Sequence, residues 1–137
     1  MVAIAFFVIA KFGAYCTFCA FAPRWFSFTD TSPVLFGLRW GAARLLIGIA
    51  AAFPIGFLYV VTVEAGFPLV ASYAISFVPM RYLEWFLLFK LMAKGRGLAF
   101  DVRANNWILL GLSVSVALDL IALAAEYFGI ASFKFFC

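Results

Sequence analysis

The chain has 137 residues, of which 68% are hydrophobic and 12% are charged; an ordinary soluble domain has roughly 45–50% apolar and 25% charged residues. A small soluble domain needs more polar residues than this to cover its surface, so the composition excludes a soluble enzyme, a disordered tail and a nucleic-acid-binding module. The net charge of +4 is explained by the basic residues that set the topology of a membrane protein.

Four stretches are long enough to cross about 30 Å of hydrocarbon as helices. In chain order they are residues 2–22, 41–62, 67–92 and 107–130. We therefore predict an all-α fold, with residues 1–137 forming a single transmembrane domain. The expected architecture is an integral membrane four-helix bundle with short connections.

The basic residues indicate an orientation for these spans. They gather in residues 24–44 and 90–103, whereas residues 63–66 hold an acidic residue and no basic one. By the positive-inside rule, the connections at 24–40 and 93–106 face the cytoplasm and both termini lie outside. The protein is accordingly predicted to lie in a bacterial-type inner membrane.

The second and fourth spans show a weak sequence similarity to each other. When they are aligned, Leu45–Gly48 (LLIG) lies over Ile108–Gly111 (ILLG). This indicates two repeated helical hairpins, an arrangement with which transporters build a site at the repeat interface. Chance is the alternative, because the same few apolar residues dominate any two membrane helices.

Three features between residues 44 and 92 share a pattern with a known family: Arg44–Gly48 (RLLIG), Ala71–Phe77 (ASYAISF), and Arg81 followed by Trp85. They resemble a hairpin of the GtrA-like family, and residues 107–130 resemble it more weakly. The resemblance implies a small four-helix membrane protein that moves polyprenyl-phosphate-linked sugars across a membrane.

Two charged residues lie deep within predicted spans. Lys11 is in the first span and Asp119 is in the fourth, both near the expected midplane. An ionisable group there costs about 3 kcal/mol or more, so it is normally paired or functional. If the two helices are neighbours, the residues can form either a proton- or cation-coupling site or a structural ion pair.

Arg81 and Glu84 are three residues apart on the third span and therefore share a helix face. They lie toward its cytoplasmic end, within snorkelling reach of the interface. Pro79 leaves the carbonyl of Ile75 without its helical donor, and broken backbone beside an arginine is a feature of anionic-substrate sites in transporters. A kinked helix with an internal ion pair is the alternative.

Few residue types remain for chemistry, because the chain has no histidine and no glutamine. We expect no catalytic residue, no metal site and no cofactor. The candidates for substrate binding or coupling are Lys11, Arg44, Arg81, Glu84, Asp119 and Glu126.

Cys16 and Cys19 form a Cys-x-x-Cys pair, which allows a third interpretation, a quinone-linked thiol oxidoreductase. Their predicted position near the cytoplasmic end of the first span favours small core residues instead. Gly48, Ala52 and Gly56 recur every four residues, and we expect this small-residue stripe to pack closely against another helix.

The main functional prediction is a small transport or translocation component that is not an enzyme and handles a lipid-linked anionic substrate. The alternative is a non-catalytic accessory subunit of a larger membrane complex. The expected partners are the lipid bilayer, an anionic lipid or lipid-linked substrate, and either further copies of the chain or other subunits, but no nucleic acid.

Overall fold

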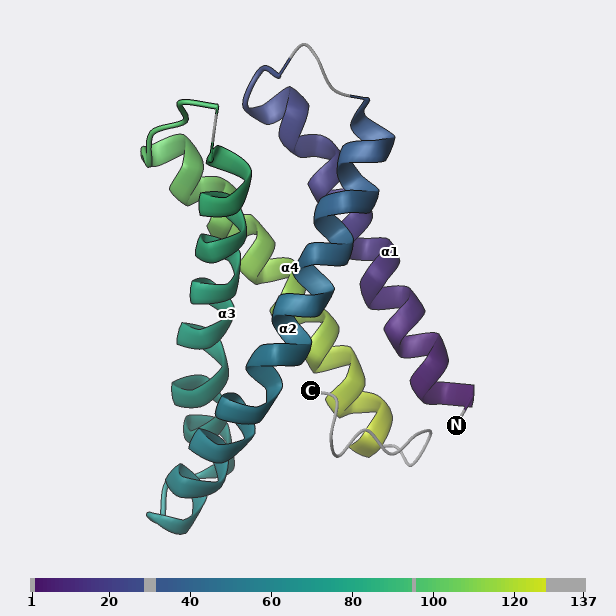
Figure 1. Ribbon diagram of the computed structural model, residues 1–137. Helices are drawn as coiled ribbons and strands as arrows, with labels where there is room; N and C mark the ends of the chain where they lie inside the picture. The colour runs from purple at the N-terminus through teal and green to yellow at the C-terminus, as the bar shows by residue number, and fades with distance from the viewer. Residues whose placement is uncertain (1, 29–31, 95, 128–137) are drawn as a thin grey trace. The chain divides into compact units, whose positions relative to one another are not determined.

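The computed structural model describes residues 2–28, 32–94 and 96–127, without the side chains of residues 2–4, 123 and 125–127. Across these ranges the chain forms four helices and no strand, which confirms the all-α fold (Figure 1). The helices are α1 (Val2–Trp25), α2 (Pro33–Glu64), α3 (Leu69–Ala93) and α4 (Val102–Tyr127).

Three of these helices contain segments long and apolar enough to cross a membrane, among the described residues. The segments are Ala5–Trp25, Pro33–Glu64 and Val102–Ala122. By length and composition, they make the chain a membrane protein. The remaining helix, α3, has 25 residues and carries Arg81, Glu84 and Lys90, which lower its hydropathy.

Two helices begin earlier than the sequence analysis predicted, so the expected connections at 24–40 and 93–106 are shorter. α2 begins at Pro33 and not at Gly41. The backbone carbonyl of Ser32 accepts the Phe36 N–H at 3.0 Å, and proline is favoured in the first helical turn. α4 begins at Val102 and not at Trp107. Asp101 caps this end, since its Oδ1 accepts the Ala104 N–H at 2.8 Å.

The first two helices end in the same way. After α1, Ser27 has a φ of 60°, and the Phe28 N–H reaches back to the Pro23 carbonyl at 2.7 Å. After α2, Gly66 has a φ of 86°, and Phe67 donates to the Thr62 carbonyl at 3.2 Å. This Schellman arrangement satisfies a terminal carbonyl and turns the chain sharply. α1 therefore continues beyond Pro23, where the predicted first span stopped.

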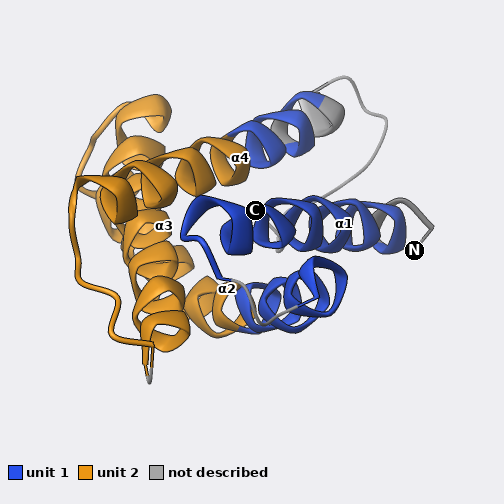
Figure 2. Ribbon diagram, turned by 90° about the horizontal axis from the view of Figure 1, so that it is seen from above, with its two compact units in different colours: residues 1–46, 117–137 blue, residues 47–116 orange. Residues whose placement is uncertain are grey.

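The chain divides into two compact units, coloured blue and orange in Figure 2. Unit 1 comprises residues 1–46 and 117–137, which include α1, the first part of α2 and the last part of α4. Unit 2 comprises residues 47–116, which include the rest of α2, all of α3 and the first part of α4.

Glycines allow α1 and α2 to pack closely in unit 1. A Cβ at Gly41 would lie 2.6 Å from the Cys16 Sγ and 2.7 Å from the Cys16 Cα. A Cβ at Gly37 would lie 2.9 Å from the Ala20 Cβ. The two backbones therefore approach too closely for any larger residue at either position.

A buried tryptophan pair forms the centre of unit 2. The rings of Trp85 on α3 and Trp107 on α4 meet edge to face, with centroids 5.3 Å apart. The indole N–H of Trp85 donates to the Ser115 hydroxyl at 2.9 Å. Gly111 lies against the Trp85 ring, where a Cβ would come within 2.6 Å of it. These contacts join α3 to α4.

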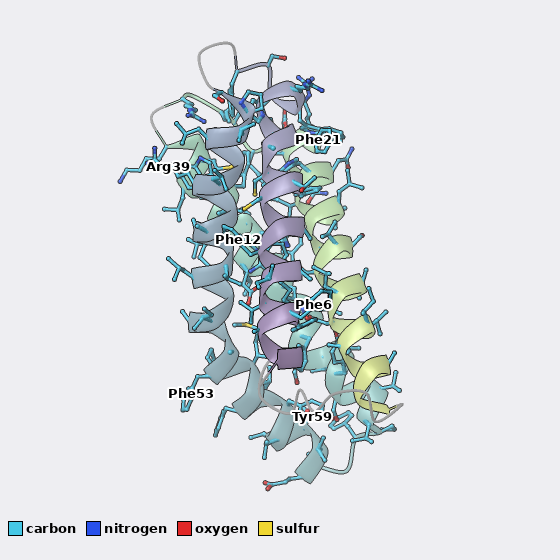
Figure 3. All side chains as sticks on the ribbon, turned by 90° about the vertical axis from the view of Figure 1, so that its right-hand side faces the viewer. Phe6, Phe12, Phe21, Arg39, Phe53 and Tyr59 are labelled. Carbon is cyan, nitrogen blue, oxygen red and sulfur yellow. The ribbon has the colours of Figure 1, made fainter. Side chains whose placement is uncertain are left out.

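Large apolar side chains also cover the outside of the helices, as expected for helices surrounded by lipid. Phe53 is 84% exposed and Phe6 is 73% exposed, and Figure 3 shows Phe53 projecting away from α2. Two residues of the predicted small-residue stripe, Ala52 and Gly56, also face outward, since both are exposed and a Cβ at Gly56 would meet nothing within 4 Å. Within the described chain, the close contacts are made by Gly37, Gly41 and Gly111 instead.

Candidate functional site

Lys11 and Asp119 form a buried ion pair in unit 1. The Lys11 Nζ lies 2.7 Å from the Asp119 Oδ1, and the two side chains are 9% and 0% exposed. The ammonium also lies 4.6 Å from the centre of the Phe7 ring, one turn earlier on α1. Counted along the helices, Lys11 is about 14 Å from the start of α1 and Asp119 is about 12 Å from the end of α4. The pair therefore lies well inside both helices, as the sequence predicted.

Arg44 is a second buried cation in unit 1. It is fully buried on α2, and its guanidinium carbon lies 4.9 Å from the centre of the Tyr15 ring on α1. Tyr15 follows Lys11 by one helical turn, so the aromatic rings of α1 contact both cations of this unit. Among the buried charged groups described in unit 1, Lys11 and Arg44 contribute +2 and Asp119 contributes −1, which leaves a net charge of +1.

Arg81 and Glu84 form the ion pair of unit 2, as their spacing predicted. One guanidinium nitrogen, Nη1, donates to both carboxylate oxygens at 3.1 and 3.0 Å. The two side chains are only 5% and 3% exposed, so the pair is buried within the chain. Pro79 lies inside α3, two residues before Arg81.

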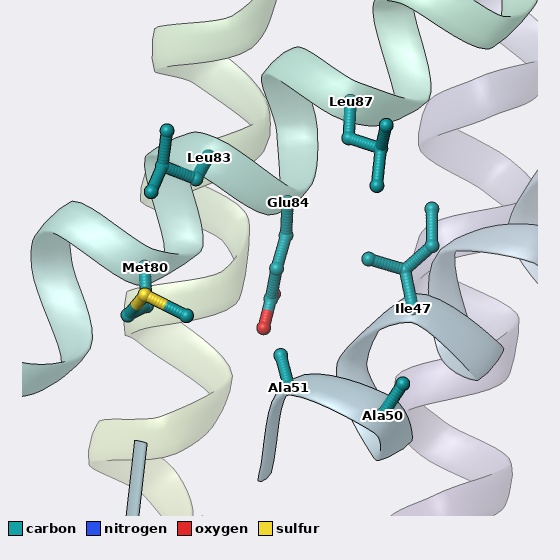
Figure 4. A pocket seen from close by; sticks show the side chains of 7 residues that line it. All are labelled: Ile47, Ala50, Ala51, Met80, Leu83, Glu84 and Leu87. Carbon is teal, nitrogen blue, oxygen red and sulfur yellow. The ribbon is translucent and has the colours of Figure 1, made fainter. Parts of the chain in front are cut away.

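A pocket of about 330 Å³ lies beside this ion pair, between α2 and α3. Its lining residues are Ile47, Ala50 and Ala51 on α2 and Met80, Leu83, Glu84 and Leu87 on α3. Figure 4 shows the Glu84 side chain extending from α3 toward Ala51 on α2. All of the lining side chains are apolar except that of Glu84. The pocket therefore combines walls suited to an apolar chain with one ion-paired carboxylate.

The sixth predicted candidate, Glu126, lies on α4, but its side chain is outside the described residues. Cys16 and Cys19 are both free thiols, and Cys19 is fully buried. In the part of the chain that the structure describes, no three histidine, cysteine or acidic residues come close enough together to hold a metal ion.

The α2 wall of the pocket was not predicted from the sequence. Ala50 and Ala51 belong to a short run of alanines in the middle of an apolar helix, and only their position opposite Glu84 gives them significance. A run of small residues facing a buried charge is a usable signal only when the two helices are known to be neighbours.

The described candidates thus form two groups. Lys11, Arg44 and Asp119 belong to unit 1, whereas Arg81, Glu84 and the pocket belong to unit 2. Comparisons with protein-family models, with characterised proteins and with solved structures find no match to this chain.

Proposed function

We propose that this chain is a small transport or translocation component for a lipid-linked anionic substrate. The observation that carries the proposal is the buried Arg81–Glu84 pair beside the apolar pocket. A buried ionisable pair is costly, and in a helix that crosses a membrane it is characteristic of substrate and ion pathways. The pocket volume of about 330 Å³ is within the range of small-ligand sites.

The apolar walls of the pocket suit the apolar chain of such a substrate, and the one polar lining residue, Glu84, is the ion-pair partner of Arg81. Aliphatic side chains from α2 and α3 would contact its apolar chain. Arg81 would hold the phosphate, since a guanidinium forms strong charge-assisted hydrogen bonds with phosphate oxygens. In this proposal the phosphate replaces the Glu84 carboxylate as the partner of Arg81. The resemblance of residues 44–92 to the GtrA-like family favours a polyprenyl-phosphate-linked sugar.

The Lys11–Asp119 pair is the proposed coupling site. The pair holds one positive and one negative charge in a buried environment, so a proton or cation that binds there changes its net charge. Arg44 and Glu126 are further candidates for this role. A chain of 15.2 kDa has little room to enclose a path, so we propose that it acts as an oligomer or within a larger membrane complex.

The binding half of the proposal is tested by blocking the pocket. Ala51→Leu adds a bulky side chain opposite Glu84, whereas Ala52→Leu makes the same change at the next, outward-facing position. The probe is geranylgeranyl phosphate carrying a diazirine, photo-crosslinked to the purified protein in detergent. Because overfilling a packed site costs about 1–3 kcal/mol, labelling of Ala51→Leu should fall about fivefold or more, and that of Ala52→Leu less than about twofold. Equal labelling of the two variants would contradict a substrate site in this pocket.

A second candidate function is an accessory subunit of a larger membrane complex. It is favoured by the outward face of α2, where Ala52 and Gly56 leave space for a closely packed helix beside the exposed Phe53 and Phe57. Purification in mild detergent separates the two functions. A stable oligomer of this chain alone favours the transport component, whereas co-purification with other subunits in fixed ratio favours the accessory subunit.

A further inference from the structure

Most of the net positive charge lies at the end of unit 2 where α3 is joined to α4. Residues 90–103 carry Lys90, Lys94, Arg96 and Arg103 against Asp101, a net charge of 4 − 1 = +3, whereas the whole chain has +4. All five of these side chains are exposed. We call this group of four cations the basic end of unit 2.

Asp101 caps the N-terminus of α4 with its carboxylate. Its Oδ1 accepts the Ala104 N–H at 2.8 Å, which makes it the N-cap of the helix. The Asp101 side chain is also exposed, and its negative charge is already counted in the net charge of this segment. With Asp101 counted, the segment that carries the basic end of unit 2 keeps its net charge of +3.

Aromatic rings hold the α3–α4 connection against α3. Phe100, in the connection, meets the Phe86 ring edge to face at 5.4 Å and the Phe89 ring at 6.1 Å. On the same surface, the Lys90 ammonium lies 5.4 Å from the centre of the Phe86 ring. Cations and partly exposed rings thus occur together, as at the headgroup level of a bilayer, where aromatic rings and Lys or Arg side chains are enriched.

A second contact joins α3 to α4 near this end. The Tyr82 hydroxyl donates to the Asn105 Oδ1 at 2.9 Å, one turn into α4. Lys90 on α3 and Arg103 on α4 are therefore carried by helices that are joined to each other, and not by a free loop. The positive charges of Lys90 and Arg103 can therefore act together on the same negatively charged surface.

We propose that the basic end of unit 2 binds the headgroups of anionic phospholipids. Charge complementarity carries the proposal: a net +3 surface beside exposed rings, at the end of membrane helices, is suited to a negatively charged headgroup layer with apolar chains below it. The ligand class is a phosphodiester with a negative headgroup, such as phosphatidylglycerol. This site is distinct from the pocket beside Arg81, and it does not depend on the transport proposal.

The test is the lipid selectivity of the full chain in phosphatidylcholine vesicles. Spin-labelled phosphatidylglycerol and spin-labelled phosphatidylcholine report the ratio of their association constants by electron paramagnetic resonance. The wild-type ratio should exceed one and should decrease as salt screens the charges. The neutral variant, Lys94→Gln with Arg96→Gln and Arg103→Gln, should bring the ratio close to one, since each such cation accounts for up to about a fivefold change.

The matched control keeps the charge and changes the side chains: Lys94→Arg, Arg96→Lys and Arg103→Lys. Its selectivity should stay close to that of the wild type. If the neutral triple variant does not fold, Arg103→Gln and Phe100→Ala should each still lower the ratio. Phe100→Ala keeps every charge and removes only the ring that holds the connection.

Three results would overturn the proposal. The first is a neutral variant, folded by circular dichroism, that retains the wild-type ratio. The second is an equal loss of selectivity in the charge-preserving control. The third is displacement of spin-labelled phosphatidylglycerol by millimolar inorganic phosphate but not by chloride of the same ionic strength, because that result indicates a site for a small anion and not a lipid surface.

Discussion

The Lys11 ammonium lies 2.7 Å from the Asp119 carboxylate, although 108 residues separate the two along the chain. The contact joins the first helix to the last within unit 1. Each residue lies in a segment apolar enough to cross a membrane. Either charge left alone there would be costly, so the pair fixes how α1 and α4 pack whether or not it also couples transport.

We expect Lys11→Leu and Asp119→Leu each to destabilise the protein strongly, because each leaves one buried charge without this partner. Breaking such a pair typically costs about 3–5 kcal/mol. The double variant should be less destabilised than either single one, because neither member of the pair is left buried without the other. The measurement is thermal unfolding in detergent, followed by circular dichroism.

The control for these variants is Lys90→Leu, which replaces an exposed lysine and should change stability by less than about 0.5 kcal/mol. Additive losses in the Lys11 and Asp119 variants, with no recovery in the double variant, would show that the two residues do not stabilise each other.

Gly111 and Gly56 provide a second comparison. A Cβ at Gly111 would come within 2.6 Å of the Trp85 ring, whereas a Cβ at Gly56 would meet nothing within 4 Å. Gly111→Ala should therefore destabilise the protein by about 1–3 kcal/mol through overpacking. Gly56→Ala should leave stability unchanged or raise it slightly, because alanine favours the helix. Chemical denaturation of the two variants side by side measures the difference, and equal effects would contradict the described packing of α3 and α4.

The sequence was sufficient to predict four helices, the shared helix face of Arg81 and Glu84, and the similar depth of Lys11 and Asp119. Long apolar stretches define membrane helices, and the three-residue spacing of Arg81 and Glu84 places them on one face. The matched depth of Lys11 and Asp119 in antiparallel helices allows an ion pair if those two helices are neighbours. These inferences need only the residue spacing within one helix and the general cost of burying a charge. Neither depends on how the helices are arranged.

Other features depend on which helices are neighbours, and the sequence does not specify this. The Gly48–Gly56 stripe was expected to pack against another helix, and among the described residues Gly37, Gly41 and Gly111 make the close contacts. Every small residue in an apolar helix is a plausible contact until the facing side chain is known. The same limit applies to the pocket. Ala51 could be recognised as a lining residue only once α2 was known to face Glu84 on α3.

The predicted orientation can be tested with single cysteines introduced after Cys16, Cys19 and Cys137 are replaced. Arg96→Cys should react only with a membrane-permeant maleimide, because its connection is predicted to face the cytoplasm. Gly66→Cys should also react with an impermeant reagent added to intact cells. Reversed accessibility would place the connections at 24–40 and 93–106 outside. It would also reopen the thiol-oxidoreductase interpretation of Cys16 and Cys19.

The most direct test of the transport proposal is translocation of a fluorescent polyprenyl phosphate in proteoliposomes, measured by dithionite quenching. The double variant Arg81→Gln with Glu84→Gln removes the guanidinium and leaves neither charge of the pair behind. Loss of a charged hydrogen bond of about 1.5–3 kcal/mol should slow translocation about tenfold or more. The control Arg39→Gln changes an exposed arginine outside both proposed sites and should retain the wild-type rate. Wild-type vesicles that quench no faster than protein-free vesicles, or a double variant as fast as the wild type, would contradict the proposal.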